Sequence, residues 1–184
     1  MERRELLKMI AVLTGSAVVG GDLFLAGCTN KTATEGFFSI DDTAFFDEVA
    51  ETIIPKTNTP GAKDAGTGQF IALYATDGYD ETNKKILREG IGKINEASEK
   101  KFGETFMKIN AAQKQELLTA IDAEAKNYSK QNPPAPHYFT LMKQLTLWGF
   151  FTSKEGATKV LRYNPVPGKY EGCIDHKKGE TSWA

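Results

Sequence analysis

Residues 137–153, HYFTLMKQLTLWGFFTS, constrain the fold more than any other part of the sequence. If this segment is helical, its apolar side chains cover most of the helix circumference. They are Tyr138, Phe139, Leu141, Met142, Leu145, Leu147, Trp148, Phe150 and Phe151. A helix that is apolar nearly all round must be buried on several sides. The sequence therefore predicts a central helix here, with other elements packed around it.

Two local patterns predict where other helices begin. Ser39 with Asp42, and Asn110 with Gln113, have the spacing of capping boxes, in which each side chain accepts a hydrogen bond from the other residue's backbone. Apolar residues at helical spacing follow both pairs. The first helix should end at Pro55, because proline cannot continue a helix.

Further helices are expected within residues 69–76, 80–101 and, as a short last helix, 153–161. No segment alternates between apolar and polar residues as a half-buried strand does. We therefore predict an all-α domain, a compact bundle of five or six helices. Residues 163–184 are rich in proline and glycine and should form an irregular C-terminal arm.

Composition narrows the class of protein. The 184 residues carry a formal net charge of −1, which does not favour nucleic acid as a partner because nucleic-acid binding needs a basic face. The length is that of one ordinary globular domain with a tail. The only cysteines are Cys28 and Cys173, so a conventional disulfide framework is excluded.

The sequence offers little for catalysis. His137 and His176 lack metal-ligand spacing to another histidine or cysteine. The segment GTGQFI at 66–71 begins like a dinucleotide fingerprint, but it lacks the third glycine and a preceding strand. No Ser/His/Asp set can be assembled. We expect no catalytic, cofactor-binding or metal-binding residue in this chain.

The N-terminal segment resembles two export signals in the right order. Arg3 and Arg4, followed by Glu-Leu-Leu-Lys, resemble the twin-arginine signal. Leu25-Ala-Gly-Cys28 resembles the lipobox of bacterial lipoproteins, in which the cysteine is acylated and becomes the first residue of the mature chain. Asp22 interrupts the apolar run, which disfavours a spanning helix. An uncleaved anchor, or a chance pair of arginines, is the alternative.

These signals predict the organisation of the chain and its location. Residues 1–27 form the signal peptide, 28–38 a polar tether and 39–184 the helical domain. Lipid on Cys28 would hold the protein stably on the periplasmic side of the bacterial envelope. Thr29, and not an aspartate, follows the cysteine, which by the usual bacterial sorting rule favours the outer membrane. The twin-arginine route is known for carrying folded proteins, so something must be folded before export.

Three stretches resemble the gluconate 2-dehydrogenase subunit 3 family, and the resemblance runs from about residue 38 to the end. The residues that carry it are Ile54-Pro55-x-Thr57-x-Thr59-Pro60-Gly61-Ala62, Thr146-Leu147-x-Gly149-Phe150-Phe151-Thr152-Ser153-x-Glu155-Gly156 and Tyr163-x-Pro165-x-Pro167-Gly168-x-Tyr170-x-Gly172-Cys173. The last two stretches are fairly specific, because they combine glycine, proline and aromatic residues in a fixed order. The lipobox is a departure, since it is not a general feature of this family.

The resemblance implies a non-catalytic accessory subunit of a membrane-associated, FAD-dependent sugar, glycoside or sugar-acid dehydrogenase. The catalytic partner in such complexes is a flavoprotein of the glucose–methanol–choline type, and a cytochrome c often receives the electrons. FAD is therefore expected in the partner, with haem c in a third subunit. The flavoprotein can lack a signal of its own, so the small subunit would escort it, folded and loaded with FAD, through the twin-arginine route.

The same stretches supply the predicted partner-binding residues. Aromatic residues are enriched at protein interfaces, and this chain has more of them than one small helical domain needs. The predicted residues are Pro55, Thr59, Pro60, Gly61, Trp148, Phe150, Phe151, Tyr163, Pro165, Pro167, Gly168, Tyr170 and Cys173. For Cys173 two interpretations stay open, a thiol buried beneath a surface-hugging arm or a thiol at the partner interface. Two other functions also stay open, a stand-alone envelope lipoprotein that scaffolds or binds a ligand, and an enzyme in its own right.

Overall fold

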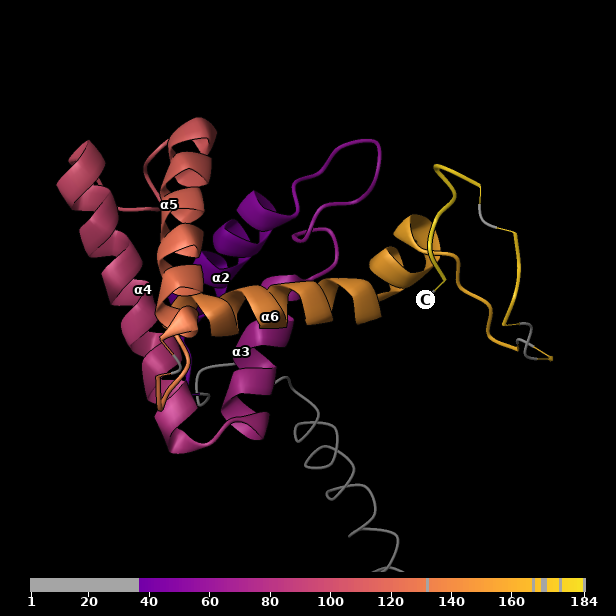
Figure 1. Ribbon diagram of the computed structural model, residues 1–184. Coiled ribbons are helices and arrows are strands. Elements are labelled where there is room, and N and C mark those ends of the chain that lie inside the picture. Colours follow the sequence, from indigo (N-terminus) through magenta and orange to yellow (C-terminus); the bar gives the residue numbers. More distant parts are fainter. Residues whose placement is uncertain (1–36, 132, 167, 170–171, 176, 184) are drawn as a thin grey trace, which may run out of the picture. The chain divides into compact units, whose positions relative to one another are not determined.

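The computed structural model describes residues 37–131, 133–166, 168–169, 172–175 and 177–183. Arg3, Arg4 and Cys28 lie outside the described residues, as do Pro167 and Tyr170. Within that part the helices are α2 (Ile40–Ile53), α3 (Thr67–Gly78), α4 (Glu81–Phe102), α5 (Ala111–Lys130), α6 (Tyr138–Thr152) and the π-helical turn η1 (Gly156–Val160) (Figure 1). The described residues contain no strand, only an isolated bridge between Arg162 and Trp183. The all-α prediction is confirmed.

Both predicted capping boxes are present. Ser39 Oγ accepts a hydrogen bond from the Asp42 amide at 3.1 Å, and Asp42 Oδ2 accepts one from the Ser39 amide at 2.8 Å. Asn110 and Gln113 make the same exchange at the start of α5, with both distances 3.0 Å. These bonds satisfy backbone donors that have no partner within a helix, so local sequence fixes both helix starts.

Helix α6 is the centre of the domain, as predicted, and packs against α2, α3, α4, α5 and η1. Its buried side chains include Phe139, Met142 and Leu145. The prediction that it is buried on several sides is confirmed, although in its C-terminal part Leu147 and Trp148 are 39% and 48% exposed. Phe70 and Tyr74 of α3 contact the Trp148 ring and cover only part of it.

Gly90 permits the close packing of α4 on α6. A Cβ atom at Gly90 would lie 2.8 Å from Tyr138 Cδ2 and 2.9 Å from Met142 Cε. Such distances are far inside van der Waals contact, so a side chain here would push the two helices apart. The Gly90 backbone thus fixes the separation of α4 from the central helix.

Two side chains of α4 hold the turn that leads to α5. Asn95 Oδ1 accepts a hydrogen bond from the Phe106 amide at 3.1 Å, and Ser98 Oγ donates one to the Glu104 carbonyl at 2.7 Å. This places the fully buried Phe106 ring against Phe45 of α2, with ring centroids 5.2 Å apart. The turn is therefore part of the core.

The helical domain begins slightly earlier than the sequence predicts. Phe37 and Phe38 fall in the expected tether of residues 28–38, but the Phe38 ring is buried against Phe46 with centroids 5.2 Å apart. The Arg88 guanidinium lies 4.6 Å from the centre of the Phe37 ring. A buried aromatic ring stabilises the segment that carries it. The boundary of the helical domain therefore lies at Phe37 and Phe38 and not after them.

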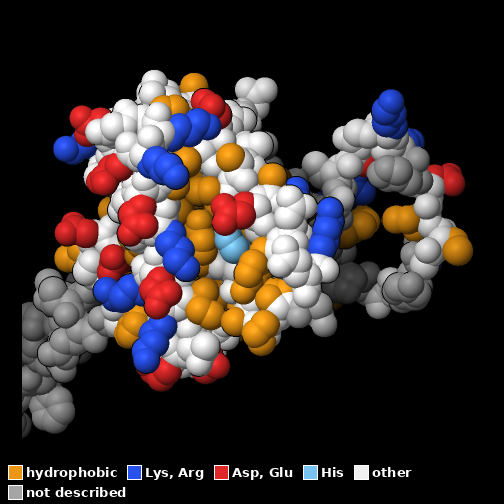
Figure 2. Space-filling model, turned by 60° about the vertical axis from the view of Figure 1, so that its left-hand side comes forward, with side chains coloured by type: hydrophobic (Ala, Val, Ile, Leu, Met, Phe, Trp, Pro, Cys, Tyr) orange, Lys and Arg blue, Asp and Glu red, His pale blue; other side chains and the backbone are white. Residues whose placement is uncertain are grey.

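His137 caps the N-terminus of α6 and lies at the floor of a groove between α4 and α5 (Figure 2). Its Nδ1 atom accepts a hydrogen bond from the Phe139 amide at 3.2 Å, which requires an unprotonated Nδ1. Burial lowers the pKa of His137, and Lys93 acts in the same direction, while Glu124 at 3.9 Å from Nε2 opposes both. Protonation would add positive charge at a helix N-terminus, where it is unfavourable.

The Gly90 contact gives a first prediction. Gly90→Ala should lower the free energy of unfolding by about 1–3 kcal/mol, because the new methyl group overpacks the contact with α6. Gly92→Ala is the matched control, since nothing lies within 4 Å of a Cβ there and alanine should stabilise the helix by about 0.5–1 kcal/mol. Chemical denaturation of both variants measures the difference. Equal effects would contradict this account of the packing.

His137 gives a prediction about pH. Because its folded-state pKa is lowered, its contribution to stability should be complete above about pH 6.5 and decline as the pH falls towards the folded pKa. Between the two pKa values, the histidine of the unfolded chain is protonated, whereas His137 in the folded protein stays neutral. Urea denaturation across about pH 5 to 8 measures the slope. His137→Asn keeps a capping acceptor without the titration and should flatten the slope; an unchanged slope would refute the assignment.

Candidate partner-docking surface

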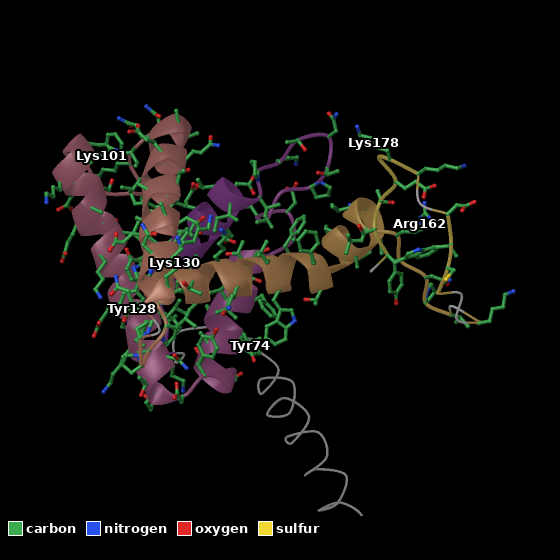
Figure 3. The ribbon with its side chains drawn as sticks, in the orientation of Figure 1. Tyr74, Lys101, Tyr128, Lys130, Arg162 and Lys178 are labelled. Carbon is green, nitrogen blue, oxygen red and sulfur yellow. The ribbon has the colours of Figure 1, made fainter. Side chains whose placement is uncertain are left out.

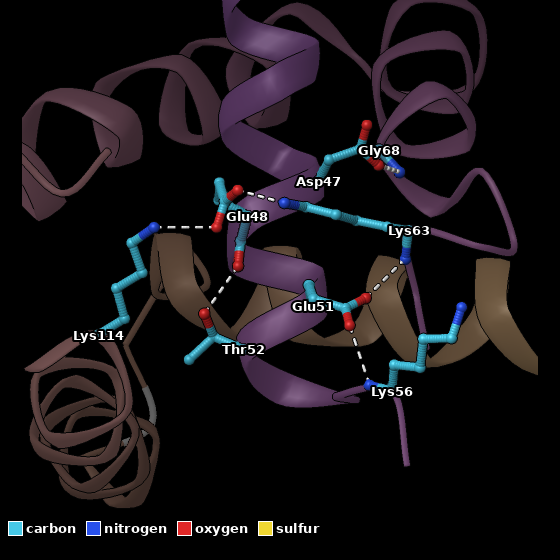
Figure 4. Close-up of polar contacts among 8 residues, drawn as sticks. All are labelled: Asp47, Glu48, Glu51, Thr52, Lys56, Lys63, Gly68 and Lys114. Carbon is cyan, nitrogen blue, oxygen red and sulfur yellow. Dashed lines mark hydrogen bonds and ion pairs between the residues drawn. The ribbon is translucent and has the colours of Figure 1, made fainter. Parts of the chain in front are cut away.

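The loop between α2 and α3 is held by carboxylates of α2 (Figure 4). Glu51 Oε1 accepts a hydrogen bond from the Lys56 amide, and Glu51 Oε2 accepts one from the Lys63 amide, both at 2.9 Å. A Cβ atom at Gly61 would lie 2.5 Å from each of these oxygens. Gly61 is buried, so its part in the first family stretch is to let the carboxylate reach the backbone of both loop ends.

The neighbouring carboxylates secure the start of α3. Asp47 Oδ1 accepts a hydrogen bond from the Gly68 amide at 2.8 Å, which caps the helix N-terminus from another helix. Glu48 pairs with Lys63 and, at 2.9 Å, with Lys114 of α5. Partial burial of Glu48 raises its pKa, but the hydrogen bonds from the two lysines outweigh this and hold the pKa below its ordinary value. Glu48 therefore stays ionised and ties the loop to α5.

The outer part of the loop is presented to solvent. Pro55 and Thr59 are exposed, and Pro60 is half-buried. Lys56 forms an ion pair with Asp64 at 2.9 Å, and its hydrogen bond is the main cause that lowers the Asp64 pKa. The loop faces η1 across an open polar groove of about 530 Å³. Its lining residues are Lys56, Thr57, Asn58, Thr59, Pro60, Asp64, Glu155 and Lys159. The structure thus brings the first two family stretches together.

Most of the second stretch has a role in the fold. A Cβ atom at Gly149 would lie 2.5 Å from Phe70 Cδ1, so glycine lets the Phe70 ring of α3 reach α6. Ser153 Oγ accepts a hydrogen bond from the Gly156 amide at 3.0 Å and caps the turn that leads into η1. Gly156 lies against the Phe150 carbonyl, where any side chain would collide. Ser153 and Gly156 thus shape the sharp turn at the end of α6, while Gly149 permits the contact between α3 and α6.

Phe150 is a correction to the predicted partner-binding set. Its ring is 1% exposed and belongs to the core, because the turn into η1 and helix α6 enclose it. Phe151, the next residue, meets the Phe150 ring edge to face, with centroids 5.2 Å apart, and is 37% exposed. Only Trp148 and Phe151 of the predicted aromatic residues in this stretch reach the surface.

Large apolar side chains of α3 and α6 are exposed or half-buried, and we refer to them together as the aromatic surface. It consists of Leu73, Tyr74, Leu147, Trp148 and Phe151. Tyr74 and Trp148 meet edge to face, with ring centroids 4.7 Å apart, and Figure 3 shows Tyr74 on α3 below α6. Leu73, on the next position of α3, is 65% exposed. Leu73 and Tyr74 are not among the predicted partner-binding residues, although both are apolar positions of a predicted helix.

The C-terminal arm differs from the expected surface-hugging segment. The Arg162 amide donates a hydrogen bond to the Ser182 carbonyl at 2.8 Å, and the Arg162 guanidinium lies 4.8 Å from the centre of the Trp183 ring. The described residues of the arm thus close on the chain's own last residues instead of on the helices. Tyr163, Pro165 and Gly168 are exposed.

Cys173 is exposed and is not in a disulfide within the described residues, so of the two interpretations left open, a thiol buried beneath the arm is wrong. The physical reason is that the described arm residues lie away from the helical core and leave nothing to cover the thiol. Its predicted place at a partner interface stays a prediction.

The described residues show neither a metal site nor a membrane-spanning helix. They contain no cluster of three or more His, Cys, Asp or Glu side chains arranged to hold a metal ion. None of the helices in this part of the chain has the length and apolar character needed to cross a membrane.

The role of Glu51 gives a prediction. Glu51→Ala should speed hydrogen exchange at the Lys56 and Lys63 amides and lower the free energy of unfolding by about 1–3 kcal/mol, because two amides lose a charged acceptor. NMR hydrogen exchange and denaturation measure the two effects. Glu99→Ala, which removes an exposed carboxylate of α4, is the control. Unchanged exchange at both amides would show that Glu51 does not hold the loop.

Comparison with known proteins agrees with the sequence resemblance. The family model described as gluconate 2-dehydrogenase subunit 3 matches residues 40–168, which is more than half of the chain. Comparisons with curated proteins and with solved structures found no match. The matched region begins at α2 and ends in the arm, so it includes the α2–α3 loop, the aromatic surface and the turn at η1. The chain belongs to the gluconate 2-dehydrogenase subunit 3 family.

Proposed function

We propose that this chain is the non-catalytic small subunit of a periplasmic, FAD-dependent sugar, glycoside or sugar-acid dehydrogenase. It binds the folded flavoprotein in the cytoplasm, leads it through the twin-arginine route with Arg3 and Arg4, and anchors it through lipid on Cys28. The observation that carries the proposal is the match to a family whose name describes a dehydrogenase subunit. The export and lipidation motifs in the sequence support the escort and the anchor.

The cofactors of such a complex belong to its other subunits in this proposal. FAD is held by the flavoprotein, and haem c by a third, cytochrome subunit. This chain supplies the docking surface, the export signal and the lipid anchor. Its own arrangement supports that division, since the α2 carboxylates Asp47, Glu48 and Glu51 contact amides and lysines that build the fold.

The aromatic surface is the proposed site of docking. Trp148, Phe151 and Leu73 expose large apolar side chains on adjoining helices, while the exposed loop from Pro55 to Thr59 supplies polar groups from the first family stretch. An apolar centre with polar surroundings is the usual anatomy of a protein interface. Tryptophan and tyrosine at the centre of such a surface often carry much of the binding energy.

Docking can be tested with Trp148→Ala and Leu73→Ala. Each should weaken binding to the co-expressed flavoprotein, Trp148→Ala by about 1–3 kcal/mol, because the partner loses an aromatic anchor. Co-purification of flavin with the tagged small subunit, followed by titration, measures the loss. Met107→Ala removes a 43% exposed side chain outside the aromatic surface and should leave binding unchanged. Normal assembly of both test variants would remove this surface from the interface.

Escort can be tested separately. Arg3→Lys combined with Arg4→Lys should retain both this chain and the flavoprotein in the cytoplasm, because the partner has no export signal of its own in this proposal. Cell fractionation with dehydrogenase assays and immunoblots of both subunits measures the distribution. Arg162→Lys is the control, because it makes the same substitution outside the export signal. A flavoprotein that still reaches the periplasm would rule out the escort role.

A further inference from the structure

Four charged residues on α4 form a pattern that the proposed function does not use. Glu89, Lys93, Glu96 and Lys100 are all exposed and line the same edge of the groove between α4 and α5. Their signs alternate, and their spacing of four, three and four residues is the same from either end. We call these residues the α4 charge stripe. Read backwards, the stripe has the same spacing with every sign reversed.

That symmetry has a geometric consequence for two copies of α4. When two helices pair antiparallel about a two-fold axis that crosses between Ile94 and Asn95, Glu89 faces Lys100 of the second copy. In the same arrangement Lys93 faces Glu96 of the second copy. The two-fold axis repeats both pairs, so every member of the stripe meets an opposite charge. A parallel pairing in the same register would place each charge against its own kind.

An apolar floor lies beside the stripe. The groove between α4 and α5 has a volume of about 550 Å³, and Ile86, Ala97, Ile121 and Tyr138 contribute apolar surface to it. Figure 2 shows this face, with positive and negative side chains alternating next to hydrophobic ones. Burial of Tyr138 raises its pKa to about 12, so the ring stays neutral. An apolar strip flanked by charges is the arrangement that pairs helices in coiled coils.

We propose that this face of α4 binds α4 of a second copy of the chain in an antiparallel pair. The apolar floor supplies the association, and the charge stripe selects the partner and its orientation, because charges at an interface contribute more to specificity than to affinity. The stripe and the groove contain no residue of the aromatic surface. The pairing therefore does not depend on the proposed function, and a paired subunit keeps the aromatic surface available.

The competing explanation is that these charges pair within α4. Glu89 and Lys93 are four residues apart in the favourable order, and so are Glu96 and Lys100. The structure places Glu89 and Lys93 at 4.0 Å, the limit of an ion pair. No ion pair between Glu96 and Lys100 occurs among the described contacts. Pairs of this kind on an exposed helix contribute little, so the charges are available to a second copy.

Charge reversal separates the two explanations. The full-length chain in mild detergent should show a concentration-dependent dimer by light scattering and sedimentation equilibrium at low salt. Lys93→Glu or Glu96→Lys alone should weaken self-association by about tenfold or more, because the two-fold axis turns each change into two repulsive contacts. Lys130→Glu, the same charge change on α5 outside the stripe, should leave it unchanged.

The double variant, Lys93→Glu with Glu96→Lys, gives opposite results in the two cases. Between copies it restores both attractive pairs, so dimerisation should recover. Within one helix it places like charges four residues apart at both positions, so it should destabilise α4 most if the charges serve only that helix. An equimolar mixture of the two single variants should form a heterodimer. A wild-type chain that is monomeric at every concentration, or a double variant that fails to recover, would overturn the proposal.

Discussion

The packing of α4 on α6 through Gly90 is the constraint on which the rest of the structure depends. It brings the central helix close enough for Tyr138 and Met142 to be enclosed, and it places His137 at the base of the groove between α4 and α5. Every other helix of the described chain contacts α6. A wider separation would open the core along its whole length, since interiors of proteins are close-packed.

Some residues of the three family stretches build the fold, and only the others are available to a partner. Gly61, Gly149, Ser153 and Gly156 are explained by close approach or capping, and Phe150 by burial. What remains on the surface is the outer α2–α3 loop, two aromatic side chains of α6 and the arm. A family motif is therefore a mixture, in which framework residues hold a smaller number of exposed side chains in place.

Local signals in the sequence predicted the helices well, because capping boxes and helical spacing depend on neighbours in the chain. They could not distinguish the buried Phe150 from the exposed Phe151. On a helix that is apolar nearly all round, the sequence pattern does not show which side other elements cover. That choice depends on where α3 and η1 pack. The sequence left the exposure of Cys173 undecided for a different reason. The arm has no periodicity, and its course depends on contacts with residues at the far end of the chain.

The bridge between Arg162 and the last residues makes the arm a closed loop rather than a loose tail. Closing a loop restricts the paths open to every residue within it, and the entropic cost grows only slowly with loop length. Among the described residues, the contacts that join the two ends of this glycine- and proline-rich segment all involve Arg162, which meets Glu180, Ser182 and Trp183. Any processing or tag at the C-terminus would act on the freedom of the whole arm, although it would touch no residue of the helices.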